Sequence, residues 1–282
     1  MIGRFVRYLK RVRSIQHINL ALSRAGVTSA LRCIDMSDPV SWEFSGFSQH
    51  GEDGIIDVLT NQLLQRNRYF VEIGTGDGTE NNSSFLGIAH RYSGLMVEGN
   101  PQDAEWCKYL LRPMNYGLDF LSIFLTKENI GELQNHILFS DADLFSLDID
   151  GNDYWLAESL FAKGFRPKIA VVEYNSAFGP DRAVTVPYTD NFRVRHDGRY
   201  GLYYGCSIGA WRKLFEGYGY TFVTVESSGT NAFFVDTAHF GRDFVNALKN
   251  GTFHESQSQR REFRVDWQGQ WKLIQDMTFQ DV

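Results

Sequence analysis

The chain has 282 residues, enough for one large domain or two small ones, and its 43% hydrophobic and 22% charged residues are ordinary for a globular protein. The net charge of −6 hides an asymmetry: residues 1–34 contain seven Lys/Arg and no acid, which leaves −13 for residues 35–282 and argues against a nucleic-acid substrate. The three cysteines are odd in number and far apart, which excludes a disulfide framework and zinc-ligand spacing and favours a reducing, intracellular compartment.

The N-terminal stretch, residues 1–24, predicts an amphipathic helix. Its apolar positions recur at helical spacing: Ile2, Phe5, Val6, Leu9 and Val12. Basic residues interrupt the apolar run, which argues against a signal peptide and makes the cytoplasm the expected location. Three interpretations stay open: the helix packs on its own domain with a solvated basic face, it docks a partner subunit in an oligomer, or it lies on the inner face of an anionic membrane.

Residues 35–46 predict a linker, because Pro39 and Gly46 stand among scattered polar residues. The next stretch, SQHGEDGIIDVLTNQLLQ, predicts a helix that Ser48 caps and that has one apolar face.

The stretch YFVEIGTGDG, residues 69–78, predicts a buried strand that runs into a glycine turn and then a helix. That layout is typical of a nucleotide-binding crevice at the carboxyl end of a parallel sheet. Glu98 ends the next apolar run, GLMVE, and lies 22 residues beyond Gly76, where a carboxylate that grips a ribose is expected. A tight turn without a ligand is the alternative, and the combination with Glu98 favours a nucleotide-type cofactor.

Helix and strand patterns alternate through the rest of the chain. Helices are expected at residues 81–88, 100–111, 126–138, 152–164 and 207–217. Strands are expected at residues 94–98, within 117–125, and at 143–150, 168–175, 220–227 and 231–237. This alternation predicts a mainly parallel α/β sheet with helices on both faces. The closing pair of strands predicts a hairpin, whereas a dehydrogenase would need a second βαβ half.

A long irregular insertion, residues 176–204, follows the fifth expected strand and is rich in Tyr, Arg and Asp. Loops of this length within a domain are usually functional or disordered. Because it follows a strand end beside the crevice, we interpret it as an acceptor-binding lid.

The motifs VEIGTGDG and GLMVEGNP, with SQHGEDGI before them and SLDIDGND after them, resemble those of class I S-adenosylmethionine (SAM)-dependent methyltransferases of the FkbM-like branch. The resemblance covers roughly residues 47–236. It implies a Rossmann-like, mainly parallel seven-stranded sheet with a C-terminal antiparallel hairpin. The organisation we expect is a basic helical region (1–34), a SAM-binding domain (35–240) and a wrapping tail (241–282).

SAM is the cofactor that this resemblance implies, and its predicted contacts come from three segments. In the family, the segment that contains Gln49 and Glu52 folds over the cofactor, although helix capping explains these two residues equally well. The region of Asp119 and Phe120 meets the adenine in similar enzymes. The remaining predicted cofactor residues belong to the glycine motif and the strand after it: Glu72, Gly74, Gly76, Asp77 and Glu98.

Polar side chains end the fourth and fifth expected strands: Asp148, Asp150, Glu173 and Asn175. Oxygen ligands of these types suit Mg²⁺, and similar metal-dependent O-methyltransferases place an acid after strand four and an acid–Asn pair after strand five. The metal ligands predicted on this basis are Asp148, Glu173 and Asn175, although Tyr174 splits the pair here. A metal-free site, with Asp148 or His196 as the general base, stays open. So does a purely capping and cofactor-binding role for the acids.

Methyl transfer from SAM to a hydroxyl of a sugar, a glycan or a glycolipid-linked saccharide is the function that the resemblance and the polar insertion favour. A small secondary metabolite is the alternative acceptor. Three other classes stay open: a binding or scaffold protein on a methyltransferase-like fold, a nucleotide-sugar or NAD enzyme, and a hydrolase. The last rests on the pattern GCSIG around Ser207, with Asp236 and His239 downstream.

Overall fold

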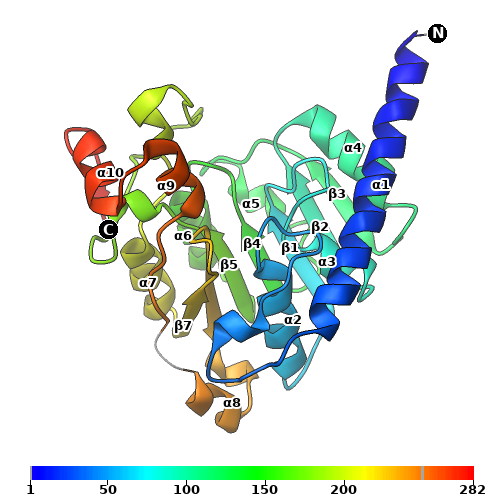
Figure 1. Ribbon diagram of the computed structural model, residues 1–282, viewed down its shortest axis with the longest axis horizontal. Coiled ribbons are helices and arrows are strands. Elements are labelled where there is room, and N and C mark those ends of the chain that lie inside the picture. The colour runs from blue at the N-terminus through cyan, green and yellow to red at the C-terminus, as the bar shows by residue number, and fades with distance from the viewer. Residues whose placement is uncertain (1, 249–250) are drawn as a thin grey trace.

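The computed structural model describes the backbone of residues 2–248 and 251–282, and the side chains of residues 8–248 and 251–282. Seven strands form the central sheet in the order β3-β2-β1-β4-β5-β8-β7 (Figure 1). They are β1 (Tyr69–Ile73), β2 (Ser93–Glu98), β3 (Leu118–Ser122), β4 (Leu144–Leu147), β5 (Ile169–Glu173), β7 (Tyr220–Val225) and β8 (Asn231–Asp236). The first five run parallel, and β8 pairs antiparallel with both β5 and β7. The prediction of a Rossmann-like methyltransferase fold with a closing hairpin is confirmed.

Helices cover both faces of this sheet. One face carries α1 (Ile2–Ala30), α2 (Glu52–Gln62), α3 (Ser84–Ile88) and α4 (Pro101–Leu111), and the other carries α5 (Ile130–Leu133), α6 (Asp153–Ala162) and α7 (Ile208–Gly217). Alternation along β1 shows why both faces are apolar. Phe70 packs with the α2 and α4 side, while Val71 and Ile73 pack with the α6 and α7 side. Strands buried on both faces read as nearly continuous apolar runs, as β1 and β5 do.

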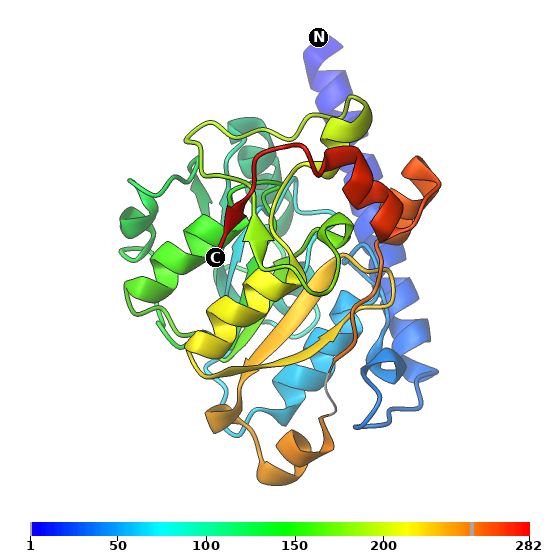
Figure 2. The same ribbon diagram turned by 90° about the vertical axis from the view of Figure 1, so that its left-hand side faces the viewer.

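The N-terminal helix α1 extends six residues beyond the predicted end and runs along one edge of the molecule (Figures 1 and 2). Its second half packs on the domain through side chains that recur on one face: Ser14, Ile18, Ala21 and Ala25. The interpretation of a helix packed on its own domain is therefore correct for this half. The first turns project past the body, and the predicted apolar positions Ile2, Phe5 and Val6 lie outside the described side chains. No described helix has the length and apolar character to cross a bilayer.

Two predicted segments differ from the structure. The helix expected at residues 126–138 is reduced to the single turn of α5, and three-residue turns replace the helical hydrogen bonds at residues 134–136. The wrapping tail contains three helices and a short strand: α8 (Arg242–Ala247), α9 (Gln257–Phe263), α10 (Trp267–Ile274) and β9 (Gln280–Asp281).

The tail lies against the insertion at residues 176–204 (Figures 1 and 2). Strand β9 pairs with β6 (Val184–Thr185) of the insertion, and α10 packs on two of its 3₁₀ turns. The 3₁₀ turns of the described chain are η1 (Pro39–Trp42), η2 (Ser176–Phe178), η3 (Gly198–Leu202) and η4 (Thr237–His239). Arg199 of the insertion also forms an ion pair with Asp276 of the tail at 2.8 Å. The tail and the insertion therefore form one packed unit beside the sheet.

Candidate active site

A pocket of about 790 Å³ opens at the carboxyl ends of β1, β2 and β4. Its lining combines the glycine turn, the ends of β2 and β3, the loop after β4 and the insertion. The polar and charged lining residues are Glu98, Asn100, Asp148, Asp150, Asn152, Arg193 and His196. Ligands of open α/β sheets bind at this edge, where neighbouring connections diverge to opposite faces.

The glycine turn after β1 is built so that only glycine fits at two of its positions. Gly74 has a φ of +93°, and a Cβ there would lie 1.7 Å from the Asp148 carbonyl oxygen. Gly78 has a φ of +81°, and a Cβ there would lie 2.7 Å from the Cys107 sulfur. Gly76, in contrast, would meet nothing within 4 Å. Both ends of the turn therefore pack closely against neighbouring parts of the chain, and its middle residue, Gly76, borders the pocket.

Glu98 and the glycine turn lie together, as the sequence predicts. The Gly76 backbone N–H donates to Glu98 Oε2 at 2.8 Å, and the Asn100 backbone N–H donates to Glu98 Oε1 at 2.7 Å. Both carboxylate oxygens keep further lone pairs for a ligand. The two backbone bonds fix the carboxylate at the pocket wall, which is the arrangement needed to hold a pair of vicinal hydroxyls.

Glu72 and Asp77 lie behind the pocket wall. Glu72 is buried and accepts hydrogen bonds from the backbone N–H groups of Asn82 and Ser83 at 2.9 and 3.2 Å. Burial raises its pKa to about 7. Asp77 accepts from Thr79 Oγ1 at 2.5 Å and forms an ion pair with Lys10 of α1 at 3.7 Å. Both acids shape the segment that follows the glycine turn, and neither lines the pocket.

The other predicted cofactor residues also lie outside the pocket lining. Gln49 is exposed, and Glu52 accepts hydrogen bonds from Asn231 Nδ2 and the His50 backbone N–H. Asp119 faces solvent near Arg112, at 3.6 Å, and Phe120 packs toward the α4 face.

The wall at β3 comes instead from the residues directly after the strand, 123–125, which the sequence interpretation missed. They form the apolar run Ile-Phe-Leu. Side chains that line such a crevice come directly after the end of a strand. The sequence did not show that β3 ends at Ser122, so it did not indicate residues 123–125.

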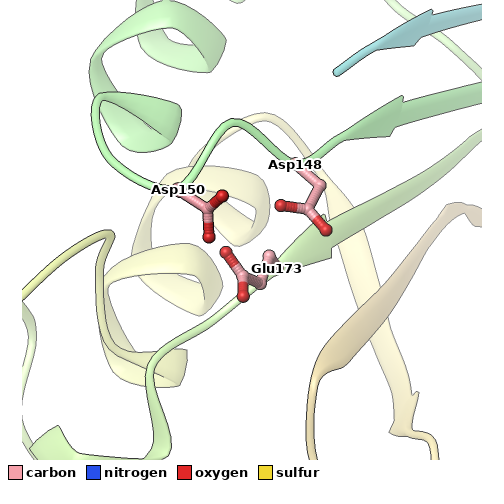
Figure 3. Close-up of side chains that lie close together, drawn as sticks. All are labelled: Asp148, Asp150 and Glu173. Atoms are coloured by element: carbon pink, nitrogen blue, oxygen red, sulfur yellow. The ribbon is translucent and has the colours of Figure 1, made fainter. Parts of the chain in front are cut away.

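Three acids converge beside the pocket (Figure 3): Asp148 and Asp150, which line it, and Glu173, which lies next to them. We call them the carboxylate cluster; one oxygen from each lies within 4.8 Å of the others. Burial, and then the charges of neighbouring acids, raise the pKa of Asp148 and of Glu173 well above their usual range. Burial also raises the pKa of Asp150, while nearby His196 opposes that shift. The cluster therefore has an excess of negative charge that a cation or protons must balance.

Asn175, predicted as a metal ligand, is not part of the carboxylate cluster. It is fully buried, and its Nδ2 donates to the carbonyl oxygens of Leu202 and Tyr204 at 2.9 and 3.0 Å. Its Oδ1 accepts from the Ala177 backbone N–H and from Gln259 Nε2, both at 3.0 Å. These bonds occupy both ends of the amide, so the prediction for Asn175 is wrong.

Asp150 takes the third position of the cluster. Strand β4 ends at Leu147, so Asp148 and Asp150 both belong to the loop that follows it. Asp150 also has a φ of +55°, a left-handed conformation that turns the loop back toward the strand end.

The insertion borders the pocket as the lid interpretation requires. Phe192 packs on Gly151, where an added Cβ would lie 2.3 Å from the ring. The Arg193 guanidinium stacks over the Phe124 ring at 4.1 Å from its centroid. His196 lies in the same lining as Asp148 and Asp150, so both candidate bases that the sequence identified share the pocket.

Ser207 serves as a helix cap. Its Oγ accepts from the Ala210 backbone N–H at 3.0 Å and donates to the Arg182 carbonyl oxygen at 2.6 Å, and the residue is fully buried. Asp236 ends β8, which runs antiparallel to β5, and His239 follows it, so both lie at the opposite edge of the sheet. The hydrolase interpretation is therefore wrong.

No family model matches the chain, and no curated protein sequence does. Among solved structures, it is similar to an O-methyltransferase from Bacillus cereus in complex with SAH, with 12% identity, a TM-score of 0.42, and coverage of 78% of this chain and 89% of that one. For the O-methyltransferase TomG from Streptomyces achromogenes in complex with SAM, the identity is 16%, the TM-score 0.42, and the coverage 77% and 95%. These are likenesses of chain fold.

Proposed function

We propose that this protein is a SAM-dependent O-methyltransferase. The observation that carries the proposal is the hydrogen bond of 2.8 Å between the Gly76 N–H and Glu98, within a pocket that continues to the carboxylate cluster. One end of the pocket thus suits a ribose-bearing cofactor, and the other suits a hydroxyl that must lose a proton.

The residues present fit SAM in chemical character. Glu98 offers two acceptor oxygens for ribose hydroxyls, and the wall at residues 123–125 is apolar, as an adenine ring requires. When bound, SAM would supply an activated methyl group. The contribution of this chain is to align the acceptor, to remove its proton and to exclude water through the insertion.

The carboxylate cluster also fits Mg²⁺. Its donor set is entirely oxygen, and burial and the mutual charges of the acids raise the pKa of Asp148 and of Glu173, which favours a bound cation. A bound Mg²⁺ would lower the pKa of a coordinated hydroxyl. His196, which lines the same pocket, is the alternative proton acceptor.

The acceptor that we propose is the hydroxyl of a glycan or a glycolipid-linked saccharide. The acceptor side of the pocket is lined by Asp150, Asn152, Arg193 and His196 together with the Phe192 ring. A mixture of hydrogen-bonding groups and aromatic surface suits a sugar. A small secondary metabolite with a free hydroxyl is the second acceptor class that this lining would accommodate.

Titration calorimetry with S-adenosylhomocysteine (SAH), and separately with NAD, tests the cofactor proposal. We expect SAH to bind with a Kd in the micromolar range and NAD to give no measurable heat. A tight complex with NAD would replace the proposal by an NAD enzyme. No binding of either ligand would favour the scaffold class.

We further propose that α1 lies on an anionic membrane surface. Its described outer face exposes Tyr8, Leu9, Leu20 and Val27, and the helix is entirely free of acids. Removing residues 1–24 would also strip Ile18 and Ala21 from the core, so point substitutions are the cleaner test.

The double substitution Leu9→Ser and Leu20→Ser is expected to reduce binding to liposomes of anionic lipid several-fold, because it removes apolar area from the outer face of α1. Co-sedimentation measures the bound fraction. Tyr116→Ser is the matched control, since Tyr116 is 78% exposed and lies outside α1. Equal binding of the double variant and the unmodified protein would refute the membrane contact.

A further inference from the structure

Arg193 differs from the arginines that follow it in the insertion. Arg195 forms an ion pair with Asp197 at 2.6 Å, and Arg199 forms one with Asp276 of the tail at 2.8 Å. Arg193 forms no ion pair with any acid whose side chain the structure describes. It is also the one of these three arginines that lines the pocket of the candidate active site. The pocket is therefore bordered by a cation that the described protein leaves without a counter-charge.

The guanidinium of Arg193 is held over the pocket wall. It stacks over the Phe124 ring at 4.1 Å from the centroid, and its Nη1 donates to the Phe192 carbonyl oxygen at 2.9 Å. The Phe124 ring packs in turn against the loop after β2, where a Cβ added to Gly99 would lie 3.0 Å from Phe124 Cδ2. A guanidinium carries its N–H donors in a planar fork. Stacking fixes the plane of this fork, and the donors that do not reach Phe192 are left for solvent or a ligand.

The same pocket is lined by Asp148 and Asp150 of the carboxylate cluster. An acceptor whose hydroxyl lies at the cluster therefore also meets Arg193 on the insertion side. The planar fork matches the paired oxygens of a carboxylate or a phosphate. A neutral sugar would leave the guanidinium without a counter-charge once the insertion excludes water. The cation proposed at the cluster would offset the repulsion between its acids and such an anion.

We propose that Arg193 is a specificity-determining residue that selects an acceptor with an anionic group: the carboxylate of a uronic acid or the phosphate of a sugar phosphate. This inference rests on the proposed function, because it takes the acceptor to be a saccharide whose hydroxyl lies at the carboxylate cluster. Arg193 then binds the anionic group through its planar fork, away from the hydroxyl that is methylated.

The test is a titration of the SAH-saturated full chain with three sugars in the presence of Mg²⁺, followed by saturation-transfer NMR. The probes are methyl β-glucuronide, glucose 1-phosphate and the neutral methyl β-glucoside. We expect at least one anionic sugar to bind about tenfold more tightly than the neutral one, the effect of hydrogen bonds to a charged group. Whichever anionic sugar binds more tightly identifies the carboxylate or the phosphate as the group selected. Arg193→Gln should reduce its affinity to that of the neutral sugar.

Arg195→Gln is the matched control. It removes the same charge from the same insertion, at a residue that is paired with Asp197 and lies outside the pocket lining. The preference for an anionic sugar should persist in this variant. SAH binding should be unchanged in both variants, and so should the affinity for Mn²⁺, a probe for the Mg²⁺ site that electron paramagnetic resonance measures. These two readouts separate the loss of one contact from damage to the fold or to the carboxylate cluster.

Equal affinity of the unmodified protein for all three sugars, or no binding of either anionic sugar, would overturn the inference. So would an unchanged preference in Arg193→Gln, or an equal loss in Arg195→Gln, which would indicate a general effect of charge. Weaker SAH binding by Arg193→Gln would assign the guanidinium to the cofactor and overturn its role toward the acceptor. In each of these cases SAH still binds to the unmodified protein and the cofactor proposal stands. If the unmodified protein fails to bind SAH, the proposed function itself is refuted.

Discussion

Glu98→Ala is expected to weaken SAH binding at least about 100-fold. Hydrogen bonds from ligand hydroxyls to a carboxylate contribute roughly 1.5–3 kcal/mol each, and two of them correspond to a factor of 100 or more in Kd. The substitution also removes the acceptor of the Gly76 N–H, which fixes the middle of the glycine turn. Titration calorimetry with SAH measures the effect, and thermal unfolding verifies that the variant is folded.

Glu105→Gln is the control for this experiment. Glu105 is an exposed acid on α4, the helix that begins just after Glu98, so the substitution changes the local charge and leaves the pocket intact. The SAH affinity of Glu98→Gln should lie between those of Glu98→Ala and Glu105→Gln, because the amide of Gln retains one acceptor oxygen. An SAH affinity in Glu98→Ala within threefold of that of the unmodified protein would show that this carboxylate has no contact with the cofactor.

The fold could be predicted from the sequence because its determinants are local. The apolar runs of β1 and β5 and the glycines at 74 and 78 each specify their own geometry, and alternation of helices with strands specifies a parallel sheet. The predicted helix after Thr126 was too long because the chain changes to three-residue turns after Leu133, a change that periodicity does not reveal. The helices of the tail are short and gain their stability from packing on the insertion, which a local pattern also does not reveal.

The candidate site was predictable only in part. Residues attached to strand ends, such as Glu98, Asp148 and Glu173, were identified because parallel strands bring their carboxyl ends to one edge. Asp150 completes the cluster because of the left-handed turn at that residue, and the Asn175 amide is held by other bonds; the spacing in the sequence shows neither feature. Gln259, which donates to Asn175, lies in a tail whose path across the molecule only the tertiary structure shows.

Asp148→Asn and Glu173→Gln are each expected to abolish turnover and to weaken Mn²⁺ binding more than about 100-fold, since each removes a charged ligand from a three-acid cluster. Asp181→Asn, at an exposed acid of the insertion, is the control and should behave like the unmodified protein. EDTA should abolish turnover of the unmodified protein and Mg²⁺ should restore it. Full turnover in EDTA would instead favour His196 as the base.

Asp148→Asn and Glu173→Gln should also stabilise the metal-free protein. A gain in stability together with a loss of Mn²⁺ affinity distinguishes the proposed role from general damage to the fold. The folded-state pKa values of Asp148 and Glu173 are raised by burial and by neighbouring acids, so the folded state binds protons more tightly than the unfolded one. Stability is therefore lost as pH rises through those folded pKa values, and Asp148→Asn should raise the Tm in EDTA at pH 8 relative to the unmodified protein. For the same reason, Mn²⁺ must displace protons, and its affinity for the unmodified protein should increase from pH 6 to pH 8. A Tm lowered by Asp148→Asn in EDTA would mean that this carboxylate is balanced within the protein, which would remove the electrostatic reason for a cation at the cluster.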